Sequence, residues 1–405
     1  MKNSDGWDLA CPDWRERLLA GRSLIPDLPL HAGEAERAVG LFNSLRLPDV
    51  VGFPRLETHG ADWFRDVLRV LFGSLRYMPN PHNEMEEILR RLVNEVFILV
   101  PKKNNKTTGG AALMMTGLLM NQRPLAEFTL IGPTQNIADS AFAQAAGMRN
   151  QDPELRDLLD VQEHLKTIKH LRSGAKLHIR TFDMKVVTGS RTAGVLIDEL
   201  HLLGAMKDGA RVIQQLRGGM ESVPEAFLAF ISTQSDLPPA GCFAAELSYA
   251  RAIRDGREPG HMLPVLYEFP EEVQTDEKKP WRNSEIWPQV LPNLGLSVHL
   301  DSLVKAYAKA RAKGEAEERL WASQFLNLEI GLALHAARWN GADYWQAAQD
   351  ETLTLDTLLA RSEVVVIGID GGGLDDLLGM YVLGREKRTQ KWLGWGRAWV
   401  DAKLL

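Results

Sequence analysis

Cysteine, long apolar runs and an excess of basic charge are all missing from this sequence. The 405 residues include only two cysteines, Cys11 and Cys242, which are too few for a disulfide framework and form no metal-ligand pair. A reducing compartment is therefore expected. No run of about 18 apolar residues is present, and residues 1–10 lack the basic and apolar regions of a signal peptide. These absences argue against a membrane-spanning or secreted protein.

The charge balance excludes a uniformly basic coat for nucleic acid, because the formal net charge is −6. Lysines and arginines between Arg76 and Lys106 could still form a local basic patch, so DNA binding stays open. The alternative is an ordinary solvated surface. With 45% hydrophobic and 25% charged residues, the composition is that of a folded protein, and the length allows about two domains with connecting elements.

Short β-branched or aromatic runs alternate with helical segments from Val96 onward. This alternation predicts an α/β domain with a mainly parallel sheet, whose ligand should lie beyond the carboxyl ends of the strands. The expected strands cover residues 96–100, 128–131, 176–182, 195–198 and 227–232.

The flanking regions have other patterns. The proline-rich first fifty residues, with one helix near 34–45, suggest an N-terminal arm, and a second helix should cover 63–72 and end near Gly73. After Pro238 and Pro239 helices dominate, with Asp301 as an expected N-cap. Further helices are expected up to Gly314 and over 316–337, a loop over 269–294, and new strands over 364–370, 377–383 and 391–400.

A polar turn joins the strand 96–100 to a helix of small residues. Lys106 and Thr107 match the Lys-Thr pair of a phosphate-binding loop, in which lysine reaches the phosphates and the hydroxyl holds magnesium. The full pattern GxxxxGK[ST] wants glycine where this chain has Val100 and Asn105, although asparagine tolerates left-handed backbone. A basic surface turn is the alternative. The candidate ATP-binding residues are Lys102, Lys103, Asn105, Lys106, Thr107 and Thr108.

Two adjacent carboxylates end the apolar strand 195–198. A carboxylate at the tip of a buried strand can hold magnesium, and the next one can orient or deprotonate an attacking water molecule. Asp198 suits the first role and Glu199 the second. A strand that simply ends in solvated acids is the alternative, which the preceding phosphate-loop candidate makes less attractive.

A second strand tip carries Ser232, Thr233 and Gln234. In motor ATPases such a tip lies beside the γ-phosphate and can report its loss to a moving element. A plain turn would look similar. Near the C-terminus, Asp370 ends another apolar strand before a glycine turn, and Asp375 follows. Two-metal cleavage of phosphodiesters needs several such carboxylates.

The ordered set of these motifs resembles the large terminase subunit of tailed bacteriophages, over nearly the whole chain. The residues that carry the resemblance are Trp63, 101–108, 131–135, 195–201, 231–234, 324–327 and 367–370.

This resemblance implies an ATP-driven motor that packages double-stranded DNA into a viral procapsid, in the cytoplasm of a bacterial host. ATP and Mg²⁺ would be its cofactors, with Mg²⁺ or Mn²⁺ in an RNase H-like nuclease site. Its partners would be DNA, further copies in a homo-oligomeric ring, the portal protein and the small terminase subunit. The implied parts are an N-terminal arm (1–60), a P-loop ATPase domain (61–240), a helical lid or linker (241–360) and an incomplete nuclease domain (361–405).

The resemblance also assigns roles. Lys106 and Thr107 would be the phosphate-loop pair, and Asp198 and Glu199 the magnesium and catalytic acids. Residues 232–234 would couple hydrolysis to movement. The first nuclease acid would be Asp370, with Asp375 as a possible second metal ligand, and the nuclease is expected to be inactive in this chain.

Two features depart from the family pattern. Phe64 follows Trp63 where the family often has a glutamine that contacts adenine. A trans-acting arginine is also expected, and the sequence does not separate Arg149, Arg156, Arg172 and Arg191. The alternatives are a helicase-like ATPase dependent on nucleic acid, which lacks a reason for the Asp370 strand, and a catalytically silent packaging scaffold.

Other conspicuous residues have structural interpretations. Met114, Met115 and Met120 should belong to the core behind the phosphate loop. His201 is expected to pack or to support the site rather than to bind metal, because no partner lies at ligand spacing. The tryptophans at 392, 395 and 399 should fill the face of a sheet.

Overall fold

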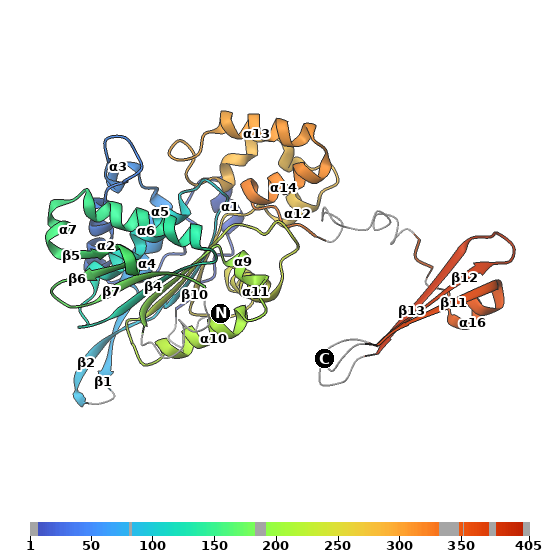
Figure 1. The fold of residues 1–405 in the computed structure, drawn as a ribbon, viewed down its shortest axis with the longest axis horizontal. Coiled ribbons are helices and arrows are strands. Elements are labelled where there is room, and N and C mark those ends of the chain that lie inside the picture. The colour runs from blue at the N-terminus through green and yellow to red at the C-terminus, as the bar shows by residue number, and fades with distance from the viewer. Residues whose placement is uncertain are drawn as a thin grey trace. The chain divides into compact units, whose positions relative to one another are not determined.

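The computed structural model describes residues 7–80, 83–182, 192–331, 348–350, 352–371 and 378–399. The chain divides into two compact units, residues 1–338 and 339–405, which are treated separately below (Figure 1). Within the described residues, none of the helices combines the length and the apolar character needed to cross a membrane.

An eight-stranded sheet forms the centre of the first unit. In spatial order its strands are β10 (Met262–Leu266), β3 (Glu95–Leu99), β9 (Phe227–Ser232), β8 (Thr192–Asp198), β4 (Glu127–Gly132), β7 (Lys176–Thr181), β6 (Thr167–His170) and β5 (Leu159–Gln162). The pairs from β10 to β7 are parallel, and β6 and β5 add an antiparallel edge. The predicted mainly parallel sheet and its five predicted strands are confirmed.

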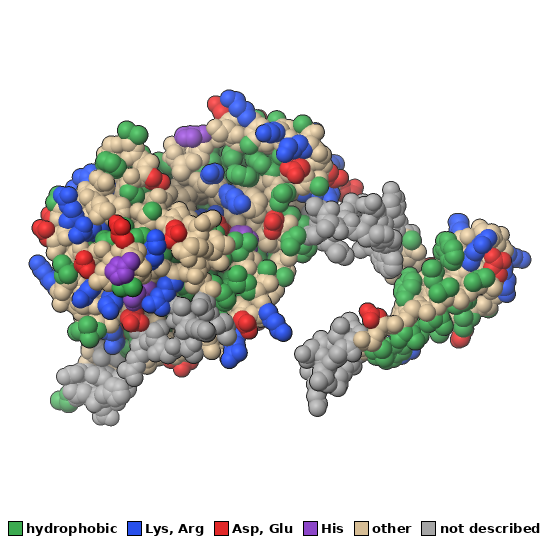
Figure 2. Space-filling model, viewed as in Figure 1, with side chains coloured by type: hydrophobic (Ala, Val, Ile, Leu, Met, Phe, Trp, Pro, Cys, Tyr) green, Lys and Arg blue, Asp and Glu red, His purple; other side chains and the backbone are tan. Residues whose placement is uncertain are grey.

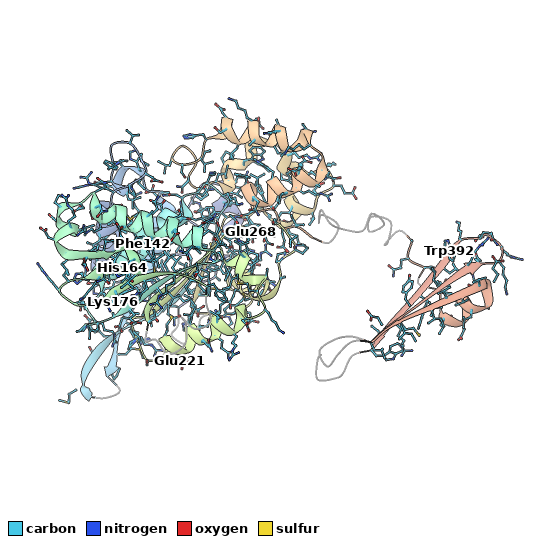
Figure 3. The ribbon with its side chains drawn as sticks, in the orientation of Figure 1. Phe142, His164, Lys176, Glu221, Glu268 and Trp392 are labelled. Carbon is cyan, nitrogen blue, oxygen red and sulfur yellow. The ribbon has the colours of Figure 1, made fainter. Side chains whose placement is uncertain are left out.

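The strand order decides which loops meet. Because β9 lies between β3 and β8, the carboxyl ends of these three strands are neighbours at one edge of the sheet. Every residue of β8 and β9 is buried, which explains their continuous apolar runs. In Figure 3, Glu221 before β9 and Glu268 after β10 mark the two opposite ends of the sheet.

Helices cover both faces of this sheet (Figure 1). One layer contains α2 (Ala32–Ser44), α4 (Asp62–Gly73), α5 (Lys106–Met120) and α6 (Gln135–Asn150), and the other contains α9 (Leu200–Gly204), α10 (Gly209–Met220) and α11 (Gly241–Arg254). Shorter helices are α1 (Trp14–Leu19), α3 (Leu56–His59), α7 (Pro153–Leu158) and the 3₁₀ turn η1 (Glu163–Leu165). The predicted helices near 34–45 and 63–72 are confirmed as α2 and α4.

Small residues let α5 approach its neighbours closely. A Cβ atom on Gly109 would come within 2.7 Å of the Phe64 ring, and one on Gly110 within 3.2 Å of Leu196. Met114 and Met115 are fully buried behind this helix start, as predicted. The small-residue run therefore allows the N-terminus of α5 to be held tightly beside the strand tips.

A helical region follows β10. It contains α12 (Glu271–Thr275), the 3₁₀ helices η2 (Pro280–Arg282) and η3 (Ser284–Val290), and the lid helices α13 (Leu300–Ala312) and α14 (Glu315–Leu326). Trp287, Tyr307 and Trp321 pack against one another at ring-centroid distances of 5.2 to 5.3 Å. The N-cap of α13 is His299, so the prediction of Asp301 was wrong. Asp301 instead lies in the first turn, where a carboxylate interacts favourably with the helix dipole.

Two elements were not predicted from the sequence. The strand β10 belongs to the central sheet although it comes from the segment expected to be a helical lid. A two-stranded antiparallel hairpin, β1 (Leu75–Asn80) and β2 (Asn83–Arg91), precedes β3. The expected helix over 316–337 ends at Leu326, and residues 332–337 lie outside the described part of the chain.

A buried charge network ties α11 to the segment after β10. The carboxylate of Glu268 accepts hydrogen bonds from the guanidinium groups of Arg251 and Arg254, at 2.5 to 2.9 Å. Arg251 also bonds Glu329 at 2.7 Å. Burial raises the pKa of Glu268, but the two guanidinium groups outweigh burial and hold this pKa below its usual range. The carboxylate is therefore charged at neutral pH and serves as an anchor for two arginines.

The second unit consists, in its described part, of α16 (Leu355–Arg361) and a three-stranded antiparallel meander of β11 (Ser362–Asp370), β12 (Leu378–Glu386) and β13 (Trp392–Trp399). The three predicted strands are confirmed. Figure 2 shows hydrophobic side chains gathered over this unit. Trp392 is 63% exposed and Trp399 41% exposed, so these tryptophans do not fill a buried sheet face as predicted.

Candidate active site

The turn between β3 and α5 has the backbone of a phosphate-binding loop. Asn105 has φ 60° and ψ 32°, so it adopts the left-handed conformation predicted for this glycine substitute. Lys103 is also left-handed, with φ 71°. Val100 needs no glycine, because its main-chain N–H continues the strand and donates to the carbonyl of Ser232 at 3.0 Å. The loop thus ends with the free N–H groups of the α5 N-terminus.

The two predicted pairs, Lys106 with Thr107 and Asp198 with Glu199, lie together. Thr107 Oγ1 donates to Oδ2 of Asp198 at 3.2 Å, and Lys106 Nζ lies 3.7 Å from Oε1 of Glu199. Burial, with repulsion from Glu199, raises the pKa of Asp198 to about 7. Burial also lowers the pKa of Lys106, against the attraction of both carboxylates. The site therefore holds a cation and two acids away from water.

Glu199 is held in a strained backbone conformation. It has φ 51° and ψ 53°, uncommon for a side chain of this kind, and its N–H donates to Oδ1 of Asp198 at 3.0 Å. Oε2 of Glu199 is buried and forms no hydrogen bond with a described residue, although Nδ1 of His201 lies 3.4 Å away. Burial lowers the pKa of His201.

The tip of β9 is entirely buried beside these acids. Ser232, Thr233 and Gln234 are all 0% exposed. Among the described residues, Thr233 Oγ1 and Gln234 Nε2 have no hydrogen-bond partner. Unpaired buried donors cost free energy, so they indicate a place that a polar ligand or water occupies.

The end of α14 contacts both the strand tip and the phosphate loop. Gln324 Nε2 donates to the carbonyl of Gln234 at 3.0 Å, and the carbonyl of Gln324 accepts from the N–H of Lys102 at 2.8 Å. Asn327 Oδ1 accepts from the N–H of Gln234 at 3.0 Å, while its Nδ2 donates to the carbonyl of Tyr267 at 2.9 Å. The sequence motif 324–327 is therefore a clamp that links the lid helices to the site.

A second set of contacts braces the loop from the segment before α13. The N–H of Asn293 donates to Oδ1 of Asn104 at 3.0 Å, and Asn293 Oδ1 accepts from Trp63 Nε1 at 2.7 Å. Ser297 Oγ donates to the carbonyl of Lys103 at 2.6 Å. These partners were missed from the sequence, because an isolated asparagine or serine in a loop gives no signal of its contacts.

Phe64 cannot replace the amide expected after Trp63. Its ring is buried and stacks on Phe42, with centroids 5.5 Å apart. A cavity of about 570 Å³ lies beside Trp63, and its lining includes Thr58, Gln289 and Leu296. The hydrogen bond from Trp63 to Asn293 connects the wall of this cavity to the phosphate loop.

The remaining loop candidates differ in exposure: Lys102 is half-buried, Lys103 exposed and Thr108 buried. Among the arginines considered for a trans role, Arg149 is committed to its own protomer, because Nε donates to the carbonyl of Leu159 and Nη2 to that of Arg156. Arg156 and Arg172 are exposed, and Arg191 lies outside the described residues.

In the second unit, Asp370 is exposed at the end of β11, where it pairs with Gly379 of β12. Asp375 lies outside the described residues. Over the described ranges, no group of three or more His, Cys, Asp or Glu side chains is arranged to hold a metal ion.

The comparisons with known proteins rest on structure. No protein-family model matches the sequence, and no curated protein matches it significantly. The large terminase of bacteriophage HK97 is 16% identical, covers 91% of this chain and 68% of its own length, and superposes with a TM-score of 0.58. The large terminase ATPase domain of Thermus phage P74-26 (12% identity, 58% of this chain, 88% of that chain, TM-score 0.39) is also similar.

The large terminase of another, thermophilic bacteriophage, in complex with ATP-gamma-S, is 16% identical and covers 75% of this chain and 62% of that one, with a TM-score of 0.35. The likeness to the HK97 protein spans both units of the present chain and agrees with the strand order around the candidate site. This chain has the fold of a bacteriophage large terminase.

Proposed function

We propose that this protein is an ATPase that drives the packaging of viral DNA, with ATP as substrate and Mg²⁺ as cofactor. The observation that carries the proposal is the meeting of Lys106 and Thr107, at the N-terminus of α5, with Asp198 and Glu199 at the tip of β8. The fold of the HK97 large terminase supports the same function.

The residues present suit a magnesium nucleotide. The N-terminal N–H groups of α5 and the ammonium of Lys106 would bind phosphate oxygens. Thr107 and Asp198 are oxygen ligands of the kind that Mg²⁺ prefers, and their 3.2 Å contact places them at one point. Magnesium held there would neutralise charge on the β- and γ-phosphates. The unpaired donors of Thr233 and Gln234 fit a site that is completed by a polar ligand.

Glu199 would act as the general base. Its carboxylate takes a proton from a water molecule whose oxygen attacks the γ-phosphorus, and the bond from that phosphorus to the β,γ-bridging oxygen breaks. The products are ADP and inorganic phosphate. Lys106, which faces Glu199 in this structure, would stabilise the negative charge that develops on the transferred group.

The base of ATP would lie in the cavity beside Trp63. This cavity adjoins the segment that braces the phosphate loop, and Thr58 and Gln289 supply polar groups in its wall. Because Phe64 is buried, recognition of the base would rely on these groups and on the ring of Trp63 rather than on an amide at position 64.

The Gln324–Asn327 clamp would carry the effect of hydrolysis to the lid helices. Ser232, Thr233 and Gln234 are the proposed coupling residues, and Gln234 bonds Gln324 through its carbonyl and Asn327 through its N–H. A shift of this strand tip on loss of the γ-phosphate would therefore displace the end of α14. Packed elements of this kind switch between discrete arrangements rather than deform continuously.

The proposal extends to the assembly that such a motor needs. Double-stranded DNA, further copies of this chain in a ring, a portal protein and a small terminase subunit would be the partners, in the cytoplasm of a bacterial host. Arg156 and Arg172 are exposed and remain candidates for the arginine that a neighbouring copy supplies. The sheet of β11–β13 would belong to a nuclease domain, with Asp370 and Asp375 as ligands of Mg²⁺ or Mn²⁺.

The test is ATP turnover by the full chain with double-stranded DNA present, measured as phosphate release with Mg²⁺ and with excess chelator. We expect Mg²⁺-dependent turnover that Lys106→Ala abolishes through loss of ATP binding. Lys305→Ala, on the exposed side of α13, is the matched control and should behave as the wild type. A wild-type chain that neither binds nor hydrolyses ATP would favour a silent scaffold. Strand separation of DNA driven by ATP would favour a helicase.

A further inference from the structure

His201 lies between the proposed general base and the proposed coupling residues. It stands in the first turn of α9, with a side chain that is only 7% exposed. Its ring packs edge-on against Phe243 of α11, with centroids 6.2 Å apart. Packing alone would account for its burial, so the hydrogen bonds of the imidazole decide whether it has a further role.

The hydrogen bonds around Ser232 fix which atoms of His201 donate. The hydroxyl of Ser232 donates its one hydrogen to the carbonyl of Thr233 at 2.8 Å, and it accepts from the main-chain N–H of His201 at 3.1 Å. Nδ1 of His201 lies 3.0 Å from the same oxygen. Since the hydroxyl hydrogen is already used, this contact is a hydrogen bond only if Nδ1 carries the hydrogen. His201 is therefore a donor at Nδ1.

The same N–H is near Glu199. Nδ1 of His201 lies 3.4 Å from Oε2, the buried oxygen that lacks a hydrogen bond within the described residues. The other oxygen of Glu199 faces Lys106 at 3.7 Å. If Lys106 binds the phosphates of ATP, as proposed above, its hold on Glu199 weakens when nucleotide enters. His201 then remains as the group that can orient this carboxylate.

We propose that His201 is a positioning residue, which holds the Glu199 carboxylate toward the attacking water and joins it to the Ser232 end of the coupling strand. The inference rests on the proposed ATPase function and adds a residue to it. His201 neither gives nor takes a proton in this role. A base oriented by a third group is a recurrent arrangement in catalysis, because the lone pair must point at the proton that it removes.

The test compares three substitutions that differ in where they place a donor. The side-chain amide of His201→Asn can occupy the position of Nδ1, whereas that of His201→Gln reaches only the position of Nε2, and His201→Ala has no donor. We expect His201→Ala and His201→Gln to lower kcat about 10- to 100-fold while KM for ATP stays close to that of the wild type. His201→Asn should recover most of the lost kcat.

Thermal unfolding of each variant, followed in parallel, separates positioning from packing. A drop in melting temperature shared by all three variants, with kcat following that drop and no recovery in His201→Asn, would overturn the proposal in favour of a packing role. Full kcat in His201→Ala would overturn it as well. These outcomes differ from failure of the ATPase proposal itself, in which the wild-type chain would show no turnover to compare.

Discussion

Replacing Asn105 by valine should weaken ATP binding, and replacing it by glycine should not. Asn105 has φ 60° and ψ 32° immediately before α5, and its side chain makes no capping hydrogen bond. Glycine adopts this backbone freely, so Asn105→Gly loses no bond and relieves strain. A β-branched side chain disfavours positive φ, so Asn105→Val must strain the loop or change its shape.

The size of the effect follows from the backbone cost. A residue held in a sparsely populated backbone region costs about 1–3 kcal/mol, which corresponds to a loss of about 5- to 150-fold in affinity if ATP binding requires this loop shape. The structure supplies the reason for that requirement, because Lys106 and Thr107 follow Asn105 directly and must face Asp198 and Glu199.

The assay is titration of each variant with ATP and Mg²⁺ by calorimetry. Asn121→Val is the matched control, because Asn121 caps the other end of α5 with φ −66° and ψ 130°, a conformation that valine adopts readily. We expect Asn105→Gly and Asn121→Val to bind as well as the wild type. Equal affinity of Asn105→Val would refute the claim that this turn holds phosphate through its left-handed residue.

Three further predictions concern regions around the site. Glu268→Gln should reduce the free energy of unfolding in urea by about 3 kcal/mol at neutral pH, because it leaves Arg254 buried beside a neutral group. Since the folded-state pKa of Glu268 is depressed, its contribution is present above the usual pKa and lost as pH falls through the folded value, so the difference from wild type should shrink in acid, and a constant difference would contradict this. Asn327→Gly should keep the left-handed backbone at φ 53° but break the bond to Gln234, so ATP-induced protection of α14 from hydrogen exchange should disappear, and unchanged protection would exclude the clamp as the link. Wild type and Asp370→Ala should cleave plasmid DNA equally poorly with Mn²⁺, because Asp370 joins no group of three or more metal-ligand side chains in the described part of the chain, whereas cleavage that depends on Asp370 would show a complete metal site.

The central strands were predictable because each is buried on both faces. A strand such as β8 reads as a continuous apolar run, and its acids mark where it leaves the core. The strand β10 escaped prediction because it is short and contains Pro264. Proline is tolerated there because β10 is an edge strand of the sheet, where a missing N–H costs least.

The candidate site was predictable only in part, for a related reason. Lys106, Thr107, Asp198 and Glu199 each follow a strand, and parallel strands bring their carboxyl ends together. The clamp of Asn327 on Gln234 joins residues 93 positions apart, and no periodicity in a single sequence reports such a contact. His201 was expected to be a packing or supporting residue, and its position between Glu199 and Ser232 became visible only with the fold.

The most direct test of the account is a paired measurement on Glu199→Gln. Binding of ATP with Mg²⁺ and release of phosphate should be measured on the same preparation, with double-stranded DNA present. The amide keeps the shape of Glu199 but cannot take the proton of water, so binding should persist while turnover is lost, by about 100-fold or more. Turnover equal to that of the wild type would contradict the assignment of Glu199 as the base and, with it, the proposed mechanism.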